Sequence, residues 1–339
     1  SFDGIKKSMS DRVLITGGAG FIGLHLGAKL VSSGYEVCIA DNFSRGIHDQ
    51  QLEEFLSNPR SSCRHVDLLN DTEAAGLGEE FNYIFHLAAI IGVKNVLTQP
   101  YSVLVQNARM LDSIIGLARQ QTRLHRFLFA STSEVYAGTL RYFDLVIPTP
   151  EEVPLALTPL TEPRTTYMLS KIYGEAMCQQ SGLPFTVFRP HNIYGPRMGM
   201  AHVIPEQLRK IWLARPEEKI EIFSIDHTRA FCYISDAVAM LQEIMTKEVC
   251  CEKTLNLGVT NPEVSMRELV EICLEVVGEK NEIYAGDPTP GSPKRRAPDM
   301  TWTYGHLESR PRVTLREGVR LTWDWYMANI FSGREETAK

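Results

Sequence analysis

Hydrophobic positions in the first half of the chain alternate between short continuous runs and longer runs with helical spacing. The short runs predict buried β-strands at 13–16, 36–41, 83–89, 127–130 and 185–189, with one more ending before Val66. The longer runs predict helices at 21–31, 100–119 and 165–180. Apolar strands separated by helices are typical of a parallel sheet covered on both faces. The pattern therefore predicts an α/β fold with a Rossmann-like, doubly wound parallel sheet.

A glycine-rich turn follows the first of these strands. Gly17, Gly20 and Gly23 recur every third residue, between the predicted strand and the predicted helix. A strand, a glycine turn and a helix in this order suit a dinucleotide, because bare backbone N–H groups and the positive helix end can face its pyrophosphate. We therefore expect this turn and the helix start to bind a dinucleotide.

Polar and small residues follow the next three strands. Asp41 ends the second strand, where a carboxylate can accept hydrogen bonds from the adenosine ribose and would repel a 2′-phosphate, so NAD is favoured over NADP. Arg45 argues the other way, since an arginine can pair with that phosphate. Asp67 either binds the adenine amine or caps the next turn. Ala88 and Ala89 would let a flat ligand approach the backbone.

The predicted helix at 165–180 carries a tyrosine and a lysine on one face. Tyr167 and Lys171 are four residues apart, so their side chains are neighbours. A phenol is a poor base at neutral pH, but a neighbouring ammonium and an oxidised nicotinamide would stabilise the phenolate. Polar residues 131–134 lie at the end of another strand, at the edge where parallel sheets bind ligands. We expect Tyr167 to act as a base there.

The periodicity changes after residue 190. Loops lengthen and the spacing becomes mixed, with one clear helix predicted at 264–277. We expect 11–189 to form an NAD-binding Rossmann domain and 190–332 a smaller mixed α/β, mainly substrate-binding portion. Residues 138–163 are rich in Pro, Thr and Glu and predict a long loop with a short helical piece. A flexible tail is expected at 1–10 and a frayed one at 333–339.

Composition narrows the classes of function. The chain has 339 residues, 22% of them charged, and a net charge of -6, which does not favour nucleic acid or an anionic membrane surface as a partner. No apolar run approaches the ~20 residues that span a bilayer. The seven cysteines are scattered without the spacing of a metal site. We expect a cytoplasmic enzyme with free thiols and no metal.

Eight motifs in order make the chain, roughly over 11–325, resemble the extended short-chain dehydrogenase/reductase family, specifically its NAD-dependent nucleotide-sugar epimerases, dehydratases and decarboxylases. They are Thr16-Gly17-Gly18-Ala19-Gly20-Phe21-Ile22-Gly23, Asp41-Asn42-Phe43-Ser44, His86-Leu87-Ala88-Ala89, Ser131-Thr132-Ser133-Glu134-Val135-Tyr136, Tyr167-Met168-Leu169-Ser170-Lys171, Arg189-Pro190-His191-Asn192-Ile193-Tyr194-Gly195-Pro196, Thr228-Arg229-Ala230-Phe231-Cys232-Tyr233-Ile234-Ser235-Asp236 and Arg295-Arg296-Ala297-Pro298-Asp299.

The resemblance implies a role for each motif. Tyr167 would take the proton of the sugar C4 hydroxyl while hydride passes to NAD, with Lys171 and Thr132 assisting, and with Glu134 and Ser133 completing the catalytic set. The NAD contacts implied are Gly17, Gly20, Phe21, Ile22, Asp41, Asn42, Ser44, Arg45, Asp67, Leu68, Leu87, Ala88, Ala89, Tyr167 and Lys171. The implied contacts with a nucleotide-diphosphate sugar are Asn192, Arg197, Val203, Arg229 and Arg296. Relatives commonly form homodimers, which is also the expectation here.

Glu134 bears on which reaction follows oxidation at C4. Plain 4-epimerases of the family usually have an uncharged residue there, whereas dehydratases and UDP-glucuronate decarboxylases usually have glutamate. Ser133 replaces the aspartic acid of glucose-type dehydratases, and Arg197, Arg229 and Arg296 stand in motifs more similar to those of the decarboxylases. Ala137 and the segment 90–94 depart from that pattern.

The preferred hypothesis is decarboxylation of a UDP-glucuronate-type substrate with tightly bound NAD. Alternatives are a 4,6-dehydratase with a GDP-mannose-like Thr-Ser-Glu site, a 4-epimerase, a dehydrogenase that releases NADH, and a non-enzymatic NAD-sensing regulator. The regulator is disfavoured because Tyr167 and Lys171 are both present.

Overall fold

The computed structural model describes residues 11–289 and 292–331. The tails expected at 1–10 and 333–339 lie outside the described residues. Within the described part, seven strands form one sheet in which every neighbouring pair is parallel. In spatial order they are β11 (Lys253–Leu257), β6 (Phe185–Pro190), β5 (Arg126–Ala130), β4 (Tyr83–His86), β1 (Arg12–Thr16), β2 (Glu36–Asp41) and β3 (Ser61–His65). The predicted Rossmann-like sheet is confirmed.

The predicted strand at 83–89 is too long. β4 ends at His86, whose last partner on β1 is Thr16. β1 stops there because the chain turns at Gly17, which has a φ of 68°. The backbone of 87–89 therefore leaves the sheet ladder and lines its edge instead.

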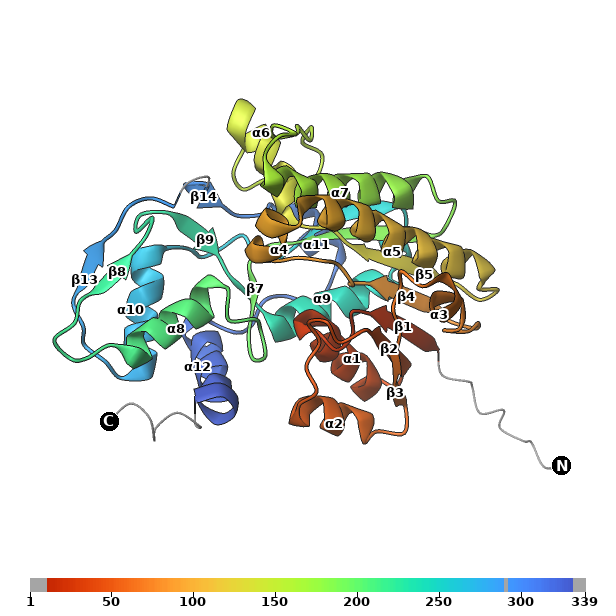
Figure 1. Cartoon of the computed structure of the whole chain (residues 1–339), viewed down its shortest axis with the longest axis horizontal. Helices are drawn as coiled ribbons and strands as arrows, with labels where there is room; N and C mark the ends of the chain where they lie inside the picture. Colours follow the sequence, from red (N-terminus) through yellow and green to blue (C-terminus); the bar gives the residue numbers. More distant parts are fainter. Residues whose placement is uncertain (1–10, 290–291, 332–339) are drawn as a thin grey trace.

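Alternating side chains of the strands enter two separate hydrophobic cores. Val13 and Ile15 of β1 pack with α1 (Phe21–Ser32) and α9 (Ile234–Thr246), whereas Leu14 packs with α5 (Pro100–Gln120) and α7 (Pro163–Gln179). In the described residues α5 packs against α7 and α1 against α9, and Figure 1 shows the first pair above the second. Both faces are covered, which is why the strand sequences are apolar throughout.

The chain returns to the sheet after residue 190. Both α9 and the edge strand β11 come from this later region, so the fold does not divide at one point of the sequence. The division into an NAD-binding and a substrate-binding part stays a prediction. The smaller portion, at the left of Figure 1, contains three small sheets. Their strands are β7 (Ile193–Tyr194) with β10 (Cys232–Tyr233), β12 (Glu263–Ser265) with β9 (Thr228–Ala230) and β14 (Arg295–Arg296), and β8 (Ile220–Ile222) with β13 (Ile283–Ala285).

Shorter helices complete the structure. They are α2 (Gln50–Leu56), α3 (Asp71–Ala75), α4 (Val93–Thr98), α6 (Ala137–Tyr142), α8 (Val203–Leu213), α10 (Met266–Val277), α11 (Thr301–His306) and α12 (Leu315–Tyr326). Short 3-10 helices lie at Ser133–Tyr136 and Glu248–Cys250, and a π-helix lies at Met327–Phe331. The helix predicted at 264–277 begins at Met266, because Ser265 and Glu268 form a capping box. The short helical piece expected within 138–163 is α6. No helix among 11–289 and 292–331 is long and apolar enough to cross a bilayer.

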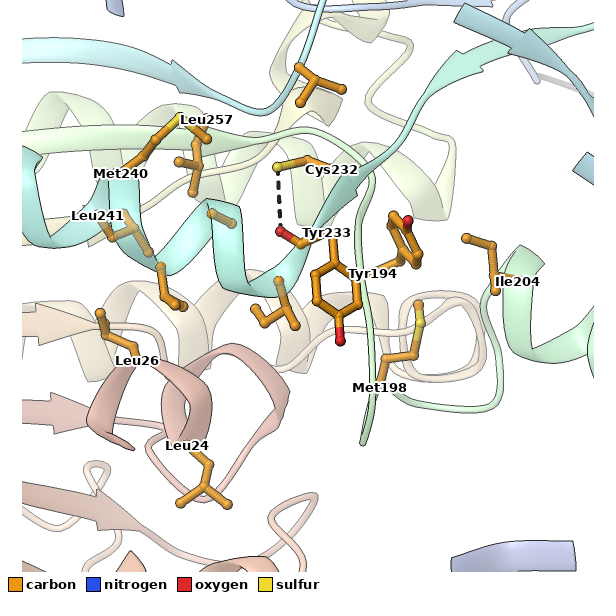
Figure 2. Close-up of a cluster of buried hydrophobic side chains, with 14 of the residues drawn as sticks. Leu24, Leu26, Tyr194, Met198, Ile204, Cys232, Tyr233, Met240, Leu241 and Leu257 are labelled. Atoms are coloured by element: carbon orange, nitrogen blue, oxygen red, sulfur yellow. Dashed lines mark hydrogen bonds between the residues drawn. The ribbon is translucent and has the colours of Figure 1, made fainter. Parts of the chain in front are cut away.

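One hydrophobic core joins the sheet to the smaller portion. Figure 2 shows Leu24 and Leu26 of α1, Met240 and Leu241 of α9, and the side chains that follow β7 in the same cluster. Tyr194 and Met198 belong to it and are almost fully buried. The segment after β7 therefore packs into the same core as α1 and α9.

Substitution of Phe188 tests how much this shared core contributes to stability. Its side chain is fully buried on β6, with its ring centroid 6.4 Å from that of Phe85. We expect Phe188→Ala to lower the free energy of unfolding by about 3–5 kcal/mol, because it leaves a cavity between packed layers. Phe143→Ala, at a ring that is 65% exposed, is the control and should change it by less than about 0.5 kcal/mol. Urea denaturation measures both, and equal losses would contradict the packing described.

Candidate active site

The glycine turn approaches the end of β4 so closely that side chains are excluded. A Cβ on Gly17 would lie 2.8 Å from the amide nitrogen of Ala88, and one on Gly23 would lie 2.5 Å from the carbonyl oxygen of Gly17. Within the described residues, no side chain caps the start of α1 at Gly20. The first N–H groups of α1, at Phe21 and Ile22, are therefore left for an anion.

Asp41 is held in place by the same turn. Its carboxylate accepts hydrogen bonds from the backbone N–H of Ala19 at 3.0 Å and of Phe43 at 2.8 Å. Each oxygen retains a lone pair for a ribose hydroxyl. Asn42, Ser44 and Arg45 follow on an exposed loop. These features fit the adenosine side of NAD, which is the ligand that sequence reasoning expected.

Asp67 caps the turn after β3, which is one of its two predicted roles, and this contact is compatible with the other. Its side chain accepts a hydrogen bond from the N–H of Leu69 at 2.9 Å and so stabilises the turn after β3. The neighbouring Leu68 is buried in the core on that face of the sheet. Both are placed at the carboxyl end of the sheet, but their contact with adenine stays a prediction.

The backbone after β4 is anchored from two sides. His86 is buried and its Nδ1 shares a hydrogen bond of 2.8 Å with the Thr16 hydroxyl. Asn107 of α5 accepts a hydrogen bond from the N–H of Ile90 at 2.7 Å and donates to the hydroxyl of Ser170 on α7 at 3.2 Å. Asn107, to which sequence reasoning gave no role, therefore ties the strip containing Leu87, Ala88 and Ala89 to the helix of the predicted base.

Tyr167 and Lys171 lie on the same face of α7, as predicted from their spacing. The Lys171 Nζ donates to the carbonyl oxygen of Ala130 at 2.8 Å and lies 5.8 Å from the centre of the Tyr167 ring. Thr132, two residues beyond β5, hydrogen-bonds the Tyr167 side chain. The structure thus brings Tyr167, Lys171 and Thr132 together at the carboxyl edge of the sheet.

Burial opposes the charged form of both residues. It raises the pKa of Tyr167, and the negative charge of Glu134 raises it further, while Thr132 and Arg45 lower it. Burial also lowers the pKa of Lys171 to about 8, against smaller raising effects from Cys178 and Glu175. The phenol is therefore protonated at neutral pH, and its use as a base requires further positive charge beside it.

Glu134 faces an arginine from a distant part of the chain. Its carboxylate lies 2.9 Å from the Arg296 Nη1, and the two side chains are 44% and 24% exposed. Arg296 of β14 is in register with Arg229 of β9. Burial and then the charge of Arg296 lower the pKa of Arg229 to about 10, and Glu134 opposes this. Two guanidiniums therefore converge on Glu134, whose charge acts on Tyr167.

The segment predicted as a long loop holds Arg296 in position. Thr149 is buried; its N–H donates to the carbonyl of Ala297, and its carbonyl accepts from the N–H of Asp299, both at 2.9 Å. Asn256 of β11 donates to that same carbonyl at 2.8 Å. The loop is thus anchored between β11 and the Arg296 strand, one residue away from the arginine.

A buried polar network, which the sequence did not reveal, adjoins the predicted catalytic residues. Arg189 of β6 forms a two-pronged ion pair with Glu175 of α7, at 2.8 and 2.7 Å, and both side chains are 5% exposed. Arg189 also donates to the Tyr136 hydroxyl at 2.8 Å, and the Ser131 hydroxyl donates to Glu175 at 2.5 Å. Residues 131 and 136 bracket the segment with Thr132, Ser133 and Glu134, so the network fixes that segment against α7.

Arg197 is not placed to bind substrate, which corrects the role that the resemblance implied. Its side chain is 1% exposed. It donates to the carbonyls of Ala19, Gly20 and Ile47 and to the Asp49 carboxylate. All five guanidinium N–H groups are used by the protein, so none is left for a ligand.

The remaining predicted substrate residues lie in the smaller portion. Asn192 has a φ of 45° and donates to the carbonyl of Ala230 at 3.1 Å. Arg229 donates to the Ser292 hydroxyl at 2.9 Å. Val203 is the first residue of α8, and the preceding His202 is close enough to Arg45 for its pKa to be lowered, after the larger effect of burial. Their contact with a nucleotide stays a prediction.

The lowered pKa of Lys171 predicts how the folding stability of the NAD-free protein depends on pH. Between pH 8 and its unfolded pKa of 10.5, this lysine is protonated in the unfolded chain and neutral in the fold, so its contribution to folding stability rises with pH. From pH 7 to 9.5 the stability of wild type should rise by about 2 kcal/mol relative to Lys171→Met. Urea denaturation of both at both pH values measures this. A difference that does not vary with pH would contradict it.

Comparisons with known proteins agree with this arrangement. The model of the NAD dependent epimerase/dehydratase family matches residues 13–258. A UDP-glucuronic acid decarboxylase 1 from Xenopus tropicalis is 33% identical over 94% of this chain and 73% of its own length. A UDP-N-acetyl-alpha-D-glucosaminuronate decarboxylase from Bacillus cytotoxicus is 30% identical over 94% of this chain and 98% of its own.

A solved structure is similar over almost the same span. The crystal structure of a UDP-galactose 4-epimerase is 30% identical, with a TM-score of 0.75, and covers 94% of this chain and 99% of the other. The residues matched by the family model, 13–258, include the glycine turn, Asp41, the Tyr167–Lys171 helix and the edge strand β11. The chain belongs to the NAD-dependent epimerase/dehydratase family, and its cofactor is NAD.

Proposed function

We propose that this protein oxidises the C4 hydroxyl of a UDP-linked uronic acid with tightly bound NAD, and then releases the C6 carboxyl group as carbon dioxide. The observation that carries the proposal is the Glu134–Arg296 pair beside Tyr167. Its support from comparison is that relatives at 30% to 33% identity are named as decarboxylases of UDP-glucuronic acid or of a UDP-N-acetylglucosaminuronate.

The first step uses the cluster at the end of β5. Tyr167 takes the proton of the C4 hydroxyl, and Thr132 holds the same oxygen. NAD, when bound, accepts the C4 hydride and later returns it. The ammonium of Lys171 and the positive charge of oxidised NAD stabilise the phenolate, which offsets the burial that raises the pKa of Tyr167.

The second step breaks the bond between C5 and C6. A ketone at C4 makes the C6 carboxylate a β-keto acid, so its bonding electrons move toward the C4 oxygen as carbon dioxide leaves. Arg296 pairs with the C6 carboxylate and orients it, and Arg229 strengthens the positive field. Decarboxylation consumes one proton, which the solvent-exposed Glu134 takes up from water and passes to C5. Reduction at C4, with return of the hydroxyl proton from Tyr167, completes the cycle.

A substrate panel tests the proposal. The NAD-loaded protein is incubated with UDP-glucuronate, UDP-N-acetylglucosaminuronate, UDP-glucose and GDP-mannose, and products are read by mass. We expect loss of carbon dioxide from an acidic sugar without net release of NADH. Loss of water would indicate the dehydratase, an unchanged mass with a new stereoisomer the 4-epimerase, and accumulating NADH an ordinary dehydrogenase.

Two variants separate the steps. Glu134→Gln should stop the reaction at the C4 ketone or slow it by roughly 100-fold or more, since a general acid contributes on that order. Tyr167→Phe is the matched control, because it should bind NAD but form no ketone at all. Product formation by Glu134→Gln at the wild-type rate would remove the main support for decarboxylation.

We also propose a homodimer formed through α4, α5 and α7. Leu97 of α4, Tyr101 of α5 and Tyr173 of α7 are 50%, 77% and 55% exposed. These helices lie side by side on one side of the molecule (Figure 1). Large apolar side chains on one such face favour contact with another protein surface. A cytoplasmic location is proposed as well, because all seven cysteines are free thiols.

Charge placed on this face should separate the copies. We expect Tyr101→Glu with Tyr173→Glu to shift the mass measured by light scattering from two chains to one, because each dimer would bury four carboxylates. Tyr284→Glu, at a 45% exposed tyrosine on β13, is the control and should stay dimeric. A wild type that already has the mass of one chain would overturn the proposal.

A further inference from the structure

Arg197 connects the smaller portion of the chain to the NAD-binding turn. It lies three residues after β7, in a segment packed into the shared core through Tyr194 and Met198 (Figure 2). The Pro196 carbonyl accepts a hydrogen bond of 2.9 Å from the Nε2 of His25 on α1. Burial lowers the pKa of His25, so the ring is neutral and carries its proton on Nε2, toward that carbonyl. The backbone before Arg197 is thereby held against α1.

The Arg197 side chain contacts two loops of the cofactor-binding half at once. Its Nη1 donates to the carbonyls of Ala19 at 2.7 Å and Gly20 at 3.0 Å. Its Nη2 donates to the carbonyl of Ile47 at 2.8 Å, and its Nε to Asp49 at 2.7 Å. The glycine turn and the loop that follows Asp41 are thus joined by one rigid planar group.

These contacts orient the N–H groups of the turn. In a trans peptide, the C=O and N–H groups point in opposite directions. Because Arg197 binds the carbonyl of Gly20, the N–H of Phe21 points away from the guanidinium, at the open start of α1. Because Arg197 binds the carbonyl of Ala19, the N–H of Gly20 also points away, and it donates to the carbonyl of Gly17 at 3.2 Å.

The backbone conformation of Arg197 and its ion pair with Asp49 both fix the position of its side chain. Its φ of 71° is uncommon for a residue other than glycine. Its charge is offset by Asp49, which also caps α2 by accepting from the N–H of Leu52 at 3.0 Å. The pair therefore adds little net charge at the cofactor site, and its effect is one of position.

We propose that Arg197 is a positioning residue for NAD, which orients the pyrophosphate-binding turn from the opposite half of the chain without touching the cofactor. The proposal requires that NAD bind at the glycine turn but does not depend on which sugar reaction follows. Loss of the guanidinium would free the carbonyl of Ala19 and leave the carbonyl of Gly20 with only its hydrogen bond from the N–H of Leu24, at 3.1 Å, so the turn could reorient. NAD affinity would fall, and the fold would persist.

NADH fluorescence titration of Arg197→Lys and Arg197→Met tests this. We expect the NADH dissociation constant to rise roughly 10- to 100-fold in both, since small displacements of positioned groups have effects of that size. Lysine at this position should not restore NADH affinity, because one ammonium cannot donate to all the acceptors, which are three backbone carbonyls and a carboxylate. Arg141→Met removes a bidentate but exposed ion pair with Glu162 and should leave NADH affinity within twofold.

Two further readouts separate positioning from charge and from general damage. The loss should be the same at 0.1 M and 1 M salt, because long-range attraction is screened at the higher concentration. UDP affinity should change less than threefold. NADH affinity within twofold of wild type in Arg197→Lys would overturn the proposal, as would an equal fall in UDP affinity. If Arg197→Met fails to fold, Arg197→Lys decides. Failure of the wild type to bind UDP would instead overturn the proposed sugar substrate.

Discussion

A buried ion pair between Arg189 and Glu175 organises the reactive edge of this protein. Two charges removed from water are tolerated only when their hydrogen-bonding groups are satisfied, and here Ser131, Tyr136 and the backbone of Glu151 complete the set. The pair joins β6 to α7, and its partners lie on either side of Thr132 and Glu134. The position of the catalytic segment relative to Tyr167 and Lys171 therefore depends on it.

Burial fixes the position of Tyr167 and Lys171, but it also disfavours the charged form of each side chain. Lys171 has a lowered pKa and Tyr167 a raised one, both first because of burial. A site of this kind is poorly prepared to remove a proton until a cation enters it. With NAD bound at this edge, as proposed, the positive charge of its oxidised nicotinamide would favour the phenolate of Tyr167.

Arginines from the later part of the chain serve the site in two different ways. Arg296 reaches the crevice and pairs with Glu134, and its strand is fixed by Thr149 and Asn256. Arg197 stays buried behind the glycine turn and contacts only protein groups. Both act across the boundary between the halves, which is possible because a single hydrophobic core runs through them. The smaller portion is thus joined to the glycine turn, where NAD binding is proposed.

The sequence by itself determined the parallel sheet, the positions of its first strands along the chain, the glycine turn, Asp41 and the Tyr167–Lys171 face. Each of these depends on local spacing and on burial patterns that repeat within one element. It also indicated NAD and the family. Only the tertiary structure decided that β4 ends at His86, that β11 completes the sheet, that Glu134 meets Arg296, and that Arg197 faces the protein instead of a ligand. These features depend on contacts between residues far apart in the sequence, such as 70 positions for Thr16 and His86 and 178 for Ala19 and Arg197. The direction in which a guanidinium points is set by which buried acceptors surround it.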